Sequence, residues 1–350
     1  MTMPGAGFPD RSGPERLSGF RAATPWTAAS AIIAAFGIVL IAIGVAGGIG
    51  VLIISAAKRM APNGEMSPAQ FMSQTNAMAA MVAMQAVIVG LVVWLAGWHG
   101  GERRAVLSLR PALSSRLFFF GLAGMALLLL PYNLAIYTLW PDDFTKDLRP
   151  FSEMARSPGA WLAGLVVTIG APFSEELLFR GFLLPALALA GARTFVGIAL
   201  GLLLVQILLP VFGLLWSTIA AGRLSTMPLV FGLTMLLLAV AALAWGWRHL
   251  GSRRPGQTET NSPAAPASQN SSMSVDPLSF LLASLFSTAA WTLMHMGYSI
   301  TGLAEVFMIG LFFCWLMWRF GNLWLTIALH AFYNGLQFVI LTQVALPAPA

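Results

Sequence analysis

The sequence predicts an all-α fold, a polytopic transmembrane helix bundle of eight or nine membrane helices with a buried polar active-site cavity. Hydrophobic residues make up 58% of the 350 residues and charged residues only 9%, whereas a soluble domain carries about 25% charged residues. Apolar runs long enough to cross a bilayer recur along the whole chain. They must be helical, because hydrocarbon offers backbone polar groups no partner and the alternation typical of a membrane barrel is absent.

Nine apolar runs are expected to form these helices. They span 27–57, 77–98, 117–139, 160–190, 195–220, 228–248, 278–297, 302–318 and 322–345. Residues 1–25 are polar, and the apolar run that follows is too long for a signal peptide. We therefore expect a disordered cytoplasmic tail over 1–25, followed by a three-helix membrane region over 26–139.

The net charge of +6 comes from arginines and lysines that collect between the apolar runs. Arg103, Arg104, Arg110 and Arg116 lie between the second and third runs. Basic loops face the cytoplasm, which places this loop and the N-terminus there and gives the charge no nucleic-acid meaning. The segment 140–159 has mixed charge and is expected to be a loop on the opposite face.

A second membrane region is expected over 160–345, interrupted by an insertion of about 195–277. Within it, residues 251–277 are dominated by Ser, Pro, Asn, Gln and Ala. Such a composition buries too little apolar area to fold. We expect a disordered linker over 251–277.

Charged side chains gather inside one apolar run, at Glu175, Glu176 and Arg180. The acids lie about 22 Å from the start of the helix expected at 160, at 1.5 Å per residue. A charge at that depth is costly and therefore needs a reason. Glu176 and Arg180 share a helix face and can pair, whereas Glu175 points about 100° away and lacks an obvious local partner. A structural ion-pair cluster is the alternative reading.

Two histidines also lie in apolar runs. His295 follows Trp291 by one turn, and Asn334 follows His330 by one turn. A carboxylate and a histidine can activate water, while imidazole and amide donors can hold an oxyanion. Glu175, His295 and His330 could equally hold zinc with one open position.

Two further polar residues receive structural interpretations. Cys314 lies in an apolar run without a histidine or asparagine at helical spacing, so it is expected to be a small buried hydrophobe. Glu305 lies near a helix start, where it is expected to reach the interface or cap the helix. No serine-hydrolase or zinc-helix motif occurs, and every aspartate falls in a tail or loop.

These residues resemble the CPBP family, the CAAX protease and bacteriocin-processing (Abi) group, which includes the type II CAAX prenyl endopeptidases. Its pattern is E-E-x-x-x-R, F-x-x-x-H and H-x-x-x-N on separate membrane helices. The motifs read here as Glu175-Glu176 to Arg180, Trp291 to His295 and His330 to Asn334. Trp291 stands where the family usually has phenylalanine, and 114 residues lie between Arg180 and His295, where a few dozen residues usually separate the first two motifs.

The resemblance implies an intramembrane endopeptidase in which Glu175 and His295 activate the water. Glu176 and Arg180 would then fix the helix that carries the acid, and His330 and Asn334 would stabilise the oxyanion. No cofactor is favoured, because an amide is a better hydrogen-bond donor than metal ligand, although a divalent metal such as zinc is the alternative.

Several functional alternatives stay open. The substrate would be a membrane-associated or lipidated peptide or protein, with membrane lipid as the other partner, and a bacterial inner membrane suits the charge pattern. One rival is a non-catalytic membrane binding or scaffold protein, such as a bacteriocin self-immunity factor. A transporter is disfavoured, since no inverted repeat is found. His295 and His330 also lie at different depths, about 26 and 12 Å from one face. Their meeting requires helix tilt, another boundary or a loop that enters the bundle.

Overall fold

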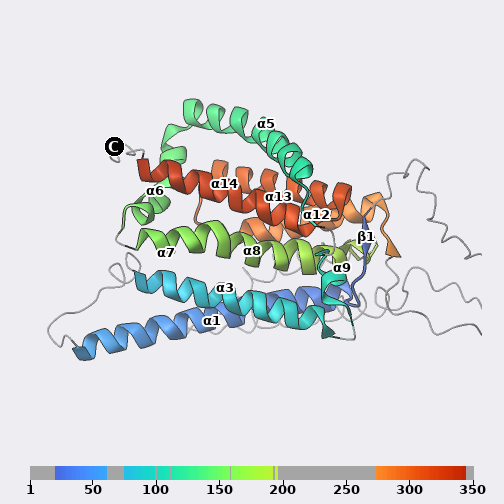
Figure 1. Cartoon of the computed structure of the whole chain (residues 1–350), viewed down its shortest axis with the longest axis horizontal. Helices are drawn as coiled ribbons and strands as arrows, with labels where there is room; N and C mark the ends of the chain where they lie inside the picture. The colour runs from blue at the N-terminus through green and yellow to red at the C-terminus, as the bar shows by residue number, and fades with distance from the viewer. Residues whose placement is uncertain are drawn as a thin grey trace, which may run out of the picture.

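The computed structural model of the chain describes residues 20–60, 75–98, 101–109, 112–157, 159–191, 194–195 and 273–343. Long antiparallel helices dominate these residues, as Figure 1 shows. Six helical segments there are long and apolar enough to cross a membrane: Ala28–Gly50, Ala77–Ala96, Ser115–Leu139, Ala160–Ala188, Ile300–Phe320 and Leu323–Gln343. The expected helices at 195–220 and 228–248 lie outside the described residues, so the expected total of eight or nine stays a prediction.

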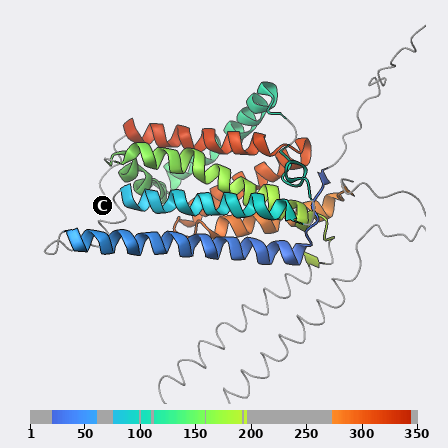
Figure 2. The same cartoon turned by 60° about the horizontal axis from the view of Figure 1, so that its bottom comes forward.

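The N-terminal region contains the three membrane helices expected between residues 26 and 139. They are α1 (Ala28–Met60), α3 (Thr75–Ala96) and α5 (Ser115–Leu139), and a short α4 (Arg103–Val106) precedes the last. Helices α1 and α3 lie side by side in both views (Figures 1 and 2). Helix α5 instead packs against α13 and α14, on the far side of the bundle from α1 (Figure 1).

A two-stranded antiparallel pairing joins the borders of the two segments expected to be disordered. Strand β1 (Arg21–Ala22) pairs with β2 (Met273–Ser274). The Val275 amide also donates to the Phe20 carbonyl at 3.2 Å. These few residues are therefore ordered, while the rest of both segments lies outside the described residues.

One continuous helical segment carries the first motif, but its turns are not uniform. It consists of α7 (Ala160–Leu165), the π-helical turn η2 (Val166–Gly170), α8 (Ala171–Glu176), the π-helical turn η3 (Leu177–Leu183) and α9 (Leu184–Ala188). Pro172 and Pro185 each follow a π turn closely. Proline has no N–H, so it leaves a carbonyl one turn earlier unbonded and favours such local widening.

The C-terminal helices are α12 (Pro277–Leu293), α13 (Ile300–Phe320) and α14 (Leu323–Gln343). The expected helix 278–297 is too long at its C-terminal end, because residues 294–297 form a turn. There the Met294 and His295 amides bond back by three residues, to Trp291 and Thr292. His295 therefore lies in the turn between α12 and α13, and not within a membrane helix.

The segment 140–159, expected to be a loop, is mostly helical. Helix α6 (Pro141–Ala155) begins with proline at its first position and has Asp142 and Asp143 in its first turn. Both features favour a helix start, but the expectation of a loop did not take them into account. In Figure 1, α6 lies at the end of the bundle opposite to β1.

Helix α6 holds the turn that contains His295. Asp147 accepts hydrogen bonds from the Ser299 amide at 2.7 Å and from the Ser299 hydroxyl at 2.5 Å. The Ser299 hydroxyl in turn accepts from the Gly302 amide at 3.0 Å, which caps α13. The start of α13, and with it the turn before it, is therefore tied to α6 through one carboxylate.

We predict that Gly302→Ala weakens this attachment. A Cβ at Gly302 would overlap the Asp147 carboxylate, whereas a Cβ at Gly297 meets nothing within 4 Å. The carboxylate must move away from Ser299, and losing a hydrogen bond to a charged group costs about 1.5–3 kcal/mol. Thermal unfolding in detergent should show a lower midpoint for Gly302→Ala. Gly297→Ala is the matched control, and equal midpoints for the two variants would contradict the role of Asp147.

Candidate active site

The expected pairing of Glu176 with Arg180 is confirmed. Arg180 Nη1 lies 3.2 Å from Glu176 Oε1, and both side chains are fully buried. The Arg180 guanidinium also lies 4.3 Å from the centre of the Trp291 ring and 5.8 Å from that of Phe313. Two aromatic faces thus cover a cation whose Nε and Nη2 have no hydrogen-bond partner among the described residues. Cation–π attraction is strongest in such desolvated settings.

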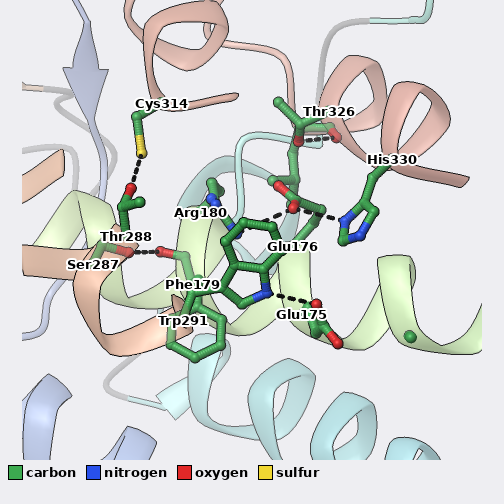
Figure 3. Close-up of polar contacts among 12 residues, drawn as sticks. Glu175, Glu176, Phe179, Arg180, Ser287, Thr288, Trp291, Cys314, Thr326 and His330 are labelled. Carbon is green, nitrogen blue, oxygen red and sulfur yellow. Dashed lines mark hydrogen bonds and ion pairs between the residues drawn. The ribbon is translucent and has the colours of Figure 1, made fainter. Parts of the chain in front are cut away.

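His330 joins this ion pair from α14. Its Nδ1 lies 3.1 Å from the same Glu176 oxygen that Arg180 contacts (Figure 3). A carboxylate only accepts, so Nδ1 carries the proton and Nε2 is the nitrogen left for another partner. The first and third sequence motifs therefore meet directly, at Glu176.

Glu175 has a partner that the sequence did not indicate. The Trp291 indole Nε1 donates to Glu175 Oε2 at 2.6 Å, as Figure 3 shows. Glu175 is half-buried, in contrast to the fully buried Glu176. The two adjacent acids therefore face different surroundings: Glu176 serves a buried ion pair, and Glu175 lies at the edge of the packed core.

The second motif reaches the site through Trp291. His295 Nδ1 lies 3.0 Å from the Trp291 carbonyl oxygen, so Nδ1 is the protonated nitrogen and Nε2 keeps its lone pair. The Trp291 ring lies 5.2 Å from the His295 ring and 5.6 Å from the His330 ring, in edge-to-face arrangements. Both histidines therefore contact one tryptophan near the end of α12, despite the different depths expected for them.

Asn334 interacts with the π turn η2. Its Nδ2 donates to the Val167 carbonyl at 3.0 Å. In η2 the Ala171 amide bonds to the Val166 carbonyl, five residues back, and the next donor in that series would be Pro172, which has none. The Asn334 amide therefore replaces the missing donor. Because an amide nitrogen carries two protons, one remains for another acceptor.

The second π turn is satisfied in a related way. The Leu184 amide bonds to the Phe179 carbonyl, and the buried Ser287 hydroxyl donates to the same carbonyl at 3.1 Å (Figure 3). At the first π turn, buried Gln85 of α3 donates to the Val166 carbonyl at 3.1 Å. Side chains from three other helices thus bind the irregular backbone on either side of the paired acids.

The zinc alternative requires Glu175, His295 and His330 to converge. Within the described residues, no three His, Cys, Asp or Glu side chains are grouped closely enough to hold a metal ion. Glu175 binds Trp291 through Oε2, and His330 binds Glu176 through Nδ1. The three residues do not fit a metal centre in this arrangement, and the mechanism below uses protein groups alone.

Glu305 does not cap α13, so that part of the interpretation was wrong. Its Oε1 accepts from Asn133 Nδ2 of α5 at 2.8 Å and from the Tyr333 hydroxyl of α14 at 2.5 Å. Gln337 donates to the same hydroxyl at 2.6 Å. The cap of α13 is Ser299. Glu305 is therefore the centre of a second polar network, which links α5, α13 and α14.

Tyr298 lies between this network and the site. Its ring is 5.5 Å from the His295 ring. Burial raises the pKa of Tyr298 well above its ordinary value, and the negative charges of Glu175, Asp147 and Glu305 raise it further. The phenol therefore stays protonated at working pH and is able to act only as a neutral donor or acceptor.

Cys314 is buried, as expected, and lies 3.6 Å from the Thr288 hydroxyl. The functional residues missed from the sequence are Trp291 as a hydrogen-bond donor, and Gln85, Asn133 and Tyr333. Each is polar within an apolar helix, which was the available signal. Their partners lie 28 to 172 residues away in the chain, and no local pattern reports such contacts.

Comparison with known proteins gives one family match. Residues 157–255 and 267–336 match the model of the family described as type II CAAX prenyl endopeptidase Rce1-like. All six site residues named from the sequence lie within the match, and its break at 256–266 falls inside the expected linker. No curated protein matches the chain, and neither does any solved structure.

The buried pair generates a stability prediction. Arg180→Met leaves Glu176 without its cation, and breaking a buried ion pair costs about 3–5 kcal/mol. Removing both charges in Glu176→Gln/Arg180→Met should cost less than the two single changes together. Unfolding in detergent measures all three. Arg319→Met is the matched control, since Arg319 is exposed and lies over Phe320 at 5.7 Å. Strict additivity of the two single changes would refute the pairing.

Proposed function

Through residues 157–336 the chain belongs to the Rce1-like family of type II CAAX prenyl endopeptidases, and we propose that it hydrolyses peptide bonds inside the membrane with a water molecule activated by Glu175. The observation that carries this proposal is the division between the two acids. Glu176 binds both Arg180 and His330, whereas Glu175 binds Trp291 through one oxygen. The other Glu175 oxygen remains for a water molecule.

The first step is attack by that water on the scissile carbonyl. Glu175 takes a proton from the water as the water oxygen bonds to the carbonyl carbon. The unprotonated Nε2 of His295, defined by the bond from Nδ1 to the Trp291 carbonyl, is the second acceptor able to orient this water. A tetrahedral intermediate with a negative oxygen results.

Stabilisation of that oxygen falls to α14. The second Nδ2 proton of Asn334 is a donor, and Nε2 of His330 is another when the ring is protonated. Both side chains are already oriented, Asn334 by Val167 and His330 by Glu176. Preorganised donors of this kind are worth about 10²–10³ in kcat each. Collapse of the intermediate breaks the C–N bond, and the proton held by Glu175 passes to the leaving amine.

We propose an orientation in the membrane from the arginines gathered at one end of the bundle. Arg21, Arg103, Arg104, Arg116 and Arg319 lie in or next to β1, α4, the start of α5 and the end of α13. Antiparallel α5, α13 and α14 bring these ends together, opposite to α6 (Figure 1). By analogy with the positive-inside rule, we propose that this end and the N-terminus face the cytoplasm, and that the membrane is a bacterial inner membrane. The substrate would be a membrane-associated or lipidated polypeptide that enters a polar cavity beside Glu175.

The test is cleavage of a fluorogenic peptide library by protein reconstituted in lipid. Glu175→Gln should lower turnover by about 10²–10⁴, the range for loss of a general base. Glu153→Gln, on the exposed face of α6, is the matched control and should keep full activity. A chelator should have no effect.

Three outcomes would change the assignment. Full activity in Glu175→Gln would reject the base role. If the protein binds zinc tightly and removal of the zinc stops turnover, water activation by protein groups alone would be rejected. A folded wild-type protein that cleaves no library member would favour a non-catalytic membrane binding protein.

A further inference from the structure

We propose that Trp291 is a positioning residue for the reaction, whose indole N–H holds the Glu175 carboxylate in its charged, water-binding orientation. This inference rests on the proposed function, because it assigns a role to the group that supports the base. It goes further in making one indole nitrogen fix the orientation in which the base works.

The hydrogen bond itself limits the state of Glu175. Indole Nε1 is a donor only, and at 2.6 Å from Oε2 it requires an acceptor there. A hydrogen bond to the charged form of a carboxylate favours that form. The bond also occupies one of the two oxygens, so the carboxylate cannot rotate freely and presents Oε1 in one direction.

The indole is able to impose this direction because it is itself immobile. Trp291 is 2% exposed, and the Arg180 guanidinium lies over its face at 4.3 Å. Gly310 of α13 leaves room for it, since a Cβ there would lie 3.0 Å from Trp291 Cε3 and 2.9 Å from Arg180 Nη2. The buried ion pair and the glycine therefore fix the tryptophan, and the tryptophan fixes the acid.

Other groups near Glu175 also influence its charge, and the test must separate them. Glu176 and Arg180 belong to the same helical segment, and Tyr298 from the turn before α13 senses the Glu175 charge. His295 and His330 contact the Trp291 ring from the turn and from α14. Replacing Trp291 by phenylalanine keeps an aromatic ring against these groups and removes the N–H donor.

The experiment compares the pH dependence of kcat/KM for the full-length wild-type protein, Trp291→Phe and Trp324→Phe. Trp324 also donates its indole N–H, to the Leu109 carbonyl at 3.2 Å, so its variant loses the same atom outside the site. Trp291→Phe should lower kcat/KM by about tenfold to a hundredfold at neutral pH, the range for a charge-assisted hydrogen bond. The size of this loss should vary with pH, because the indole N–H donates to the carboxylate. Trp324→Phe should match the wild type.

A loss that is equal at every pH would assign Trp291 to packing alone, and no loss would remove its role; either result overturns the inference. A second readout does not need activity. Unfolding of Trp291→Phe, Glu175→Gln and the double variant should be non-additive at neutral pH, and additive effects would refute the bond. If the effects of the variants on unfolding are non-additive but the wild-type protein cleaves nothing, the bond is supported. The catalytic role is then overturned together with the proposed function.

Discussion

The structure depends on a charged pair placed where water cannot solvate it. Glu176 and Arg180 are both fully buried inside a membrane helix, where an unpaired charge costs several kcal/mol. The pair is held because further groups converge on it: His330 on the carboxylate, and the Trp291 and Phe313 rings on the guanidinium. Three helices, α12, α13 and α14, are thereby brought to one point on the first-motif helix. Glu175, His295 and His330 then lie within a contact or two of this pair.

The irregular backbone around the pair also brings other helices to the first-motif helix. Two π turns leave carbonyls that a regular helix would satisfy internally, and prolines remove the donors that would follow. Asn334 of α14 replaces the donor missing at Val167, while Gln85 of α3 and Ser287 of α12 add a second hydrogen bond to carbonyls in the two turns. Because no solvent reaches a membrane interior to bind such carbonyls, each one demands a defined neighbour. The position of the helix that carries the acids is therefore fixed by side-chain hydrogen bonds to its irregular turns as much as by the packing of its apolar surface.

Burial differs among the proposed reactive groups and those that support them. Glu176, Arg180 and His330 are buried, whereas Glu175, His295 and Asn334 are half-buried. Trp291 contacts members of both sets, through its indole nitrogen, its carbonyl and its ring. Helix α6 contributes as well, because Asp147 ties it to the turn that carries His295. That histidine is thus held on a non-helical segment from two sides, by α12 and by α6.

The sequence by itself determined that the chain is a membrane helix bundle, since apolar length and scarcity of charge are properties of single segments. It also determined the Glu176–Arg180 pair, because a four-residue spacing on a helix is local. Tertiary structure decided what depends on distant partners: the hydrogen bond from Trp291 to Glu175, the meeting of His330 with Glu176, and the place of Glu305 in a network. It also decided that α6 is a helix docked on the His295 turn. Such contacts arise from how helices pack, and periodicity along one helix carries no record of the neighbour it meets.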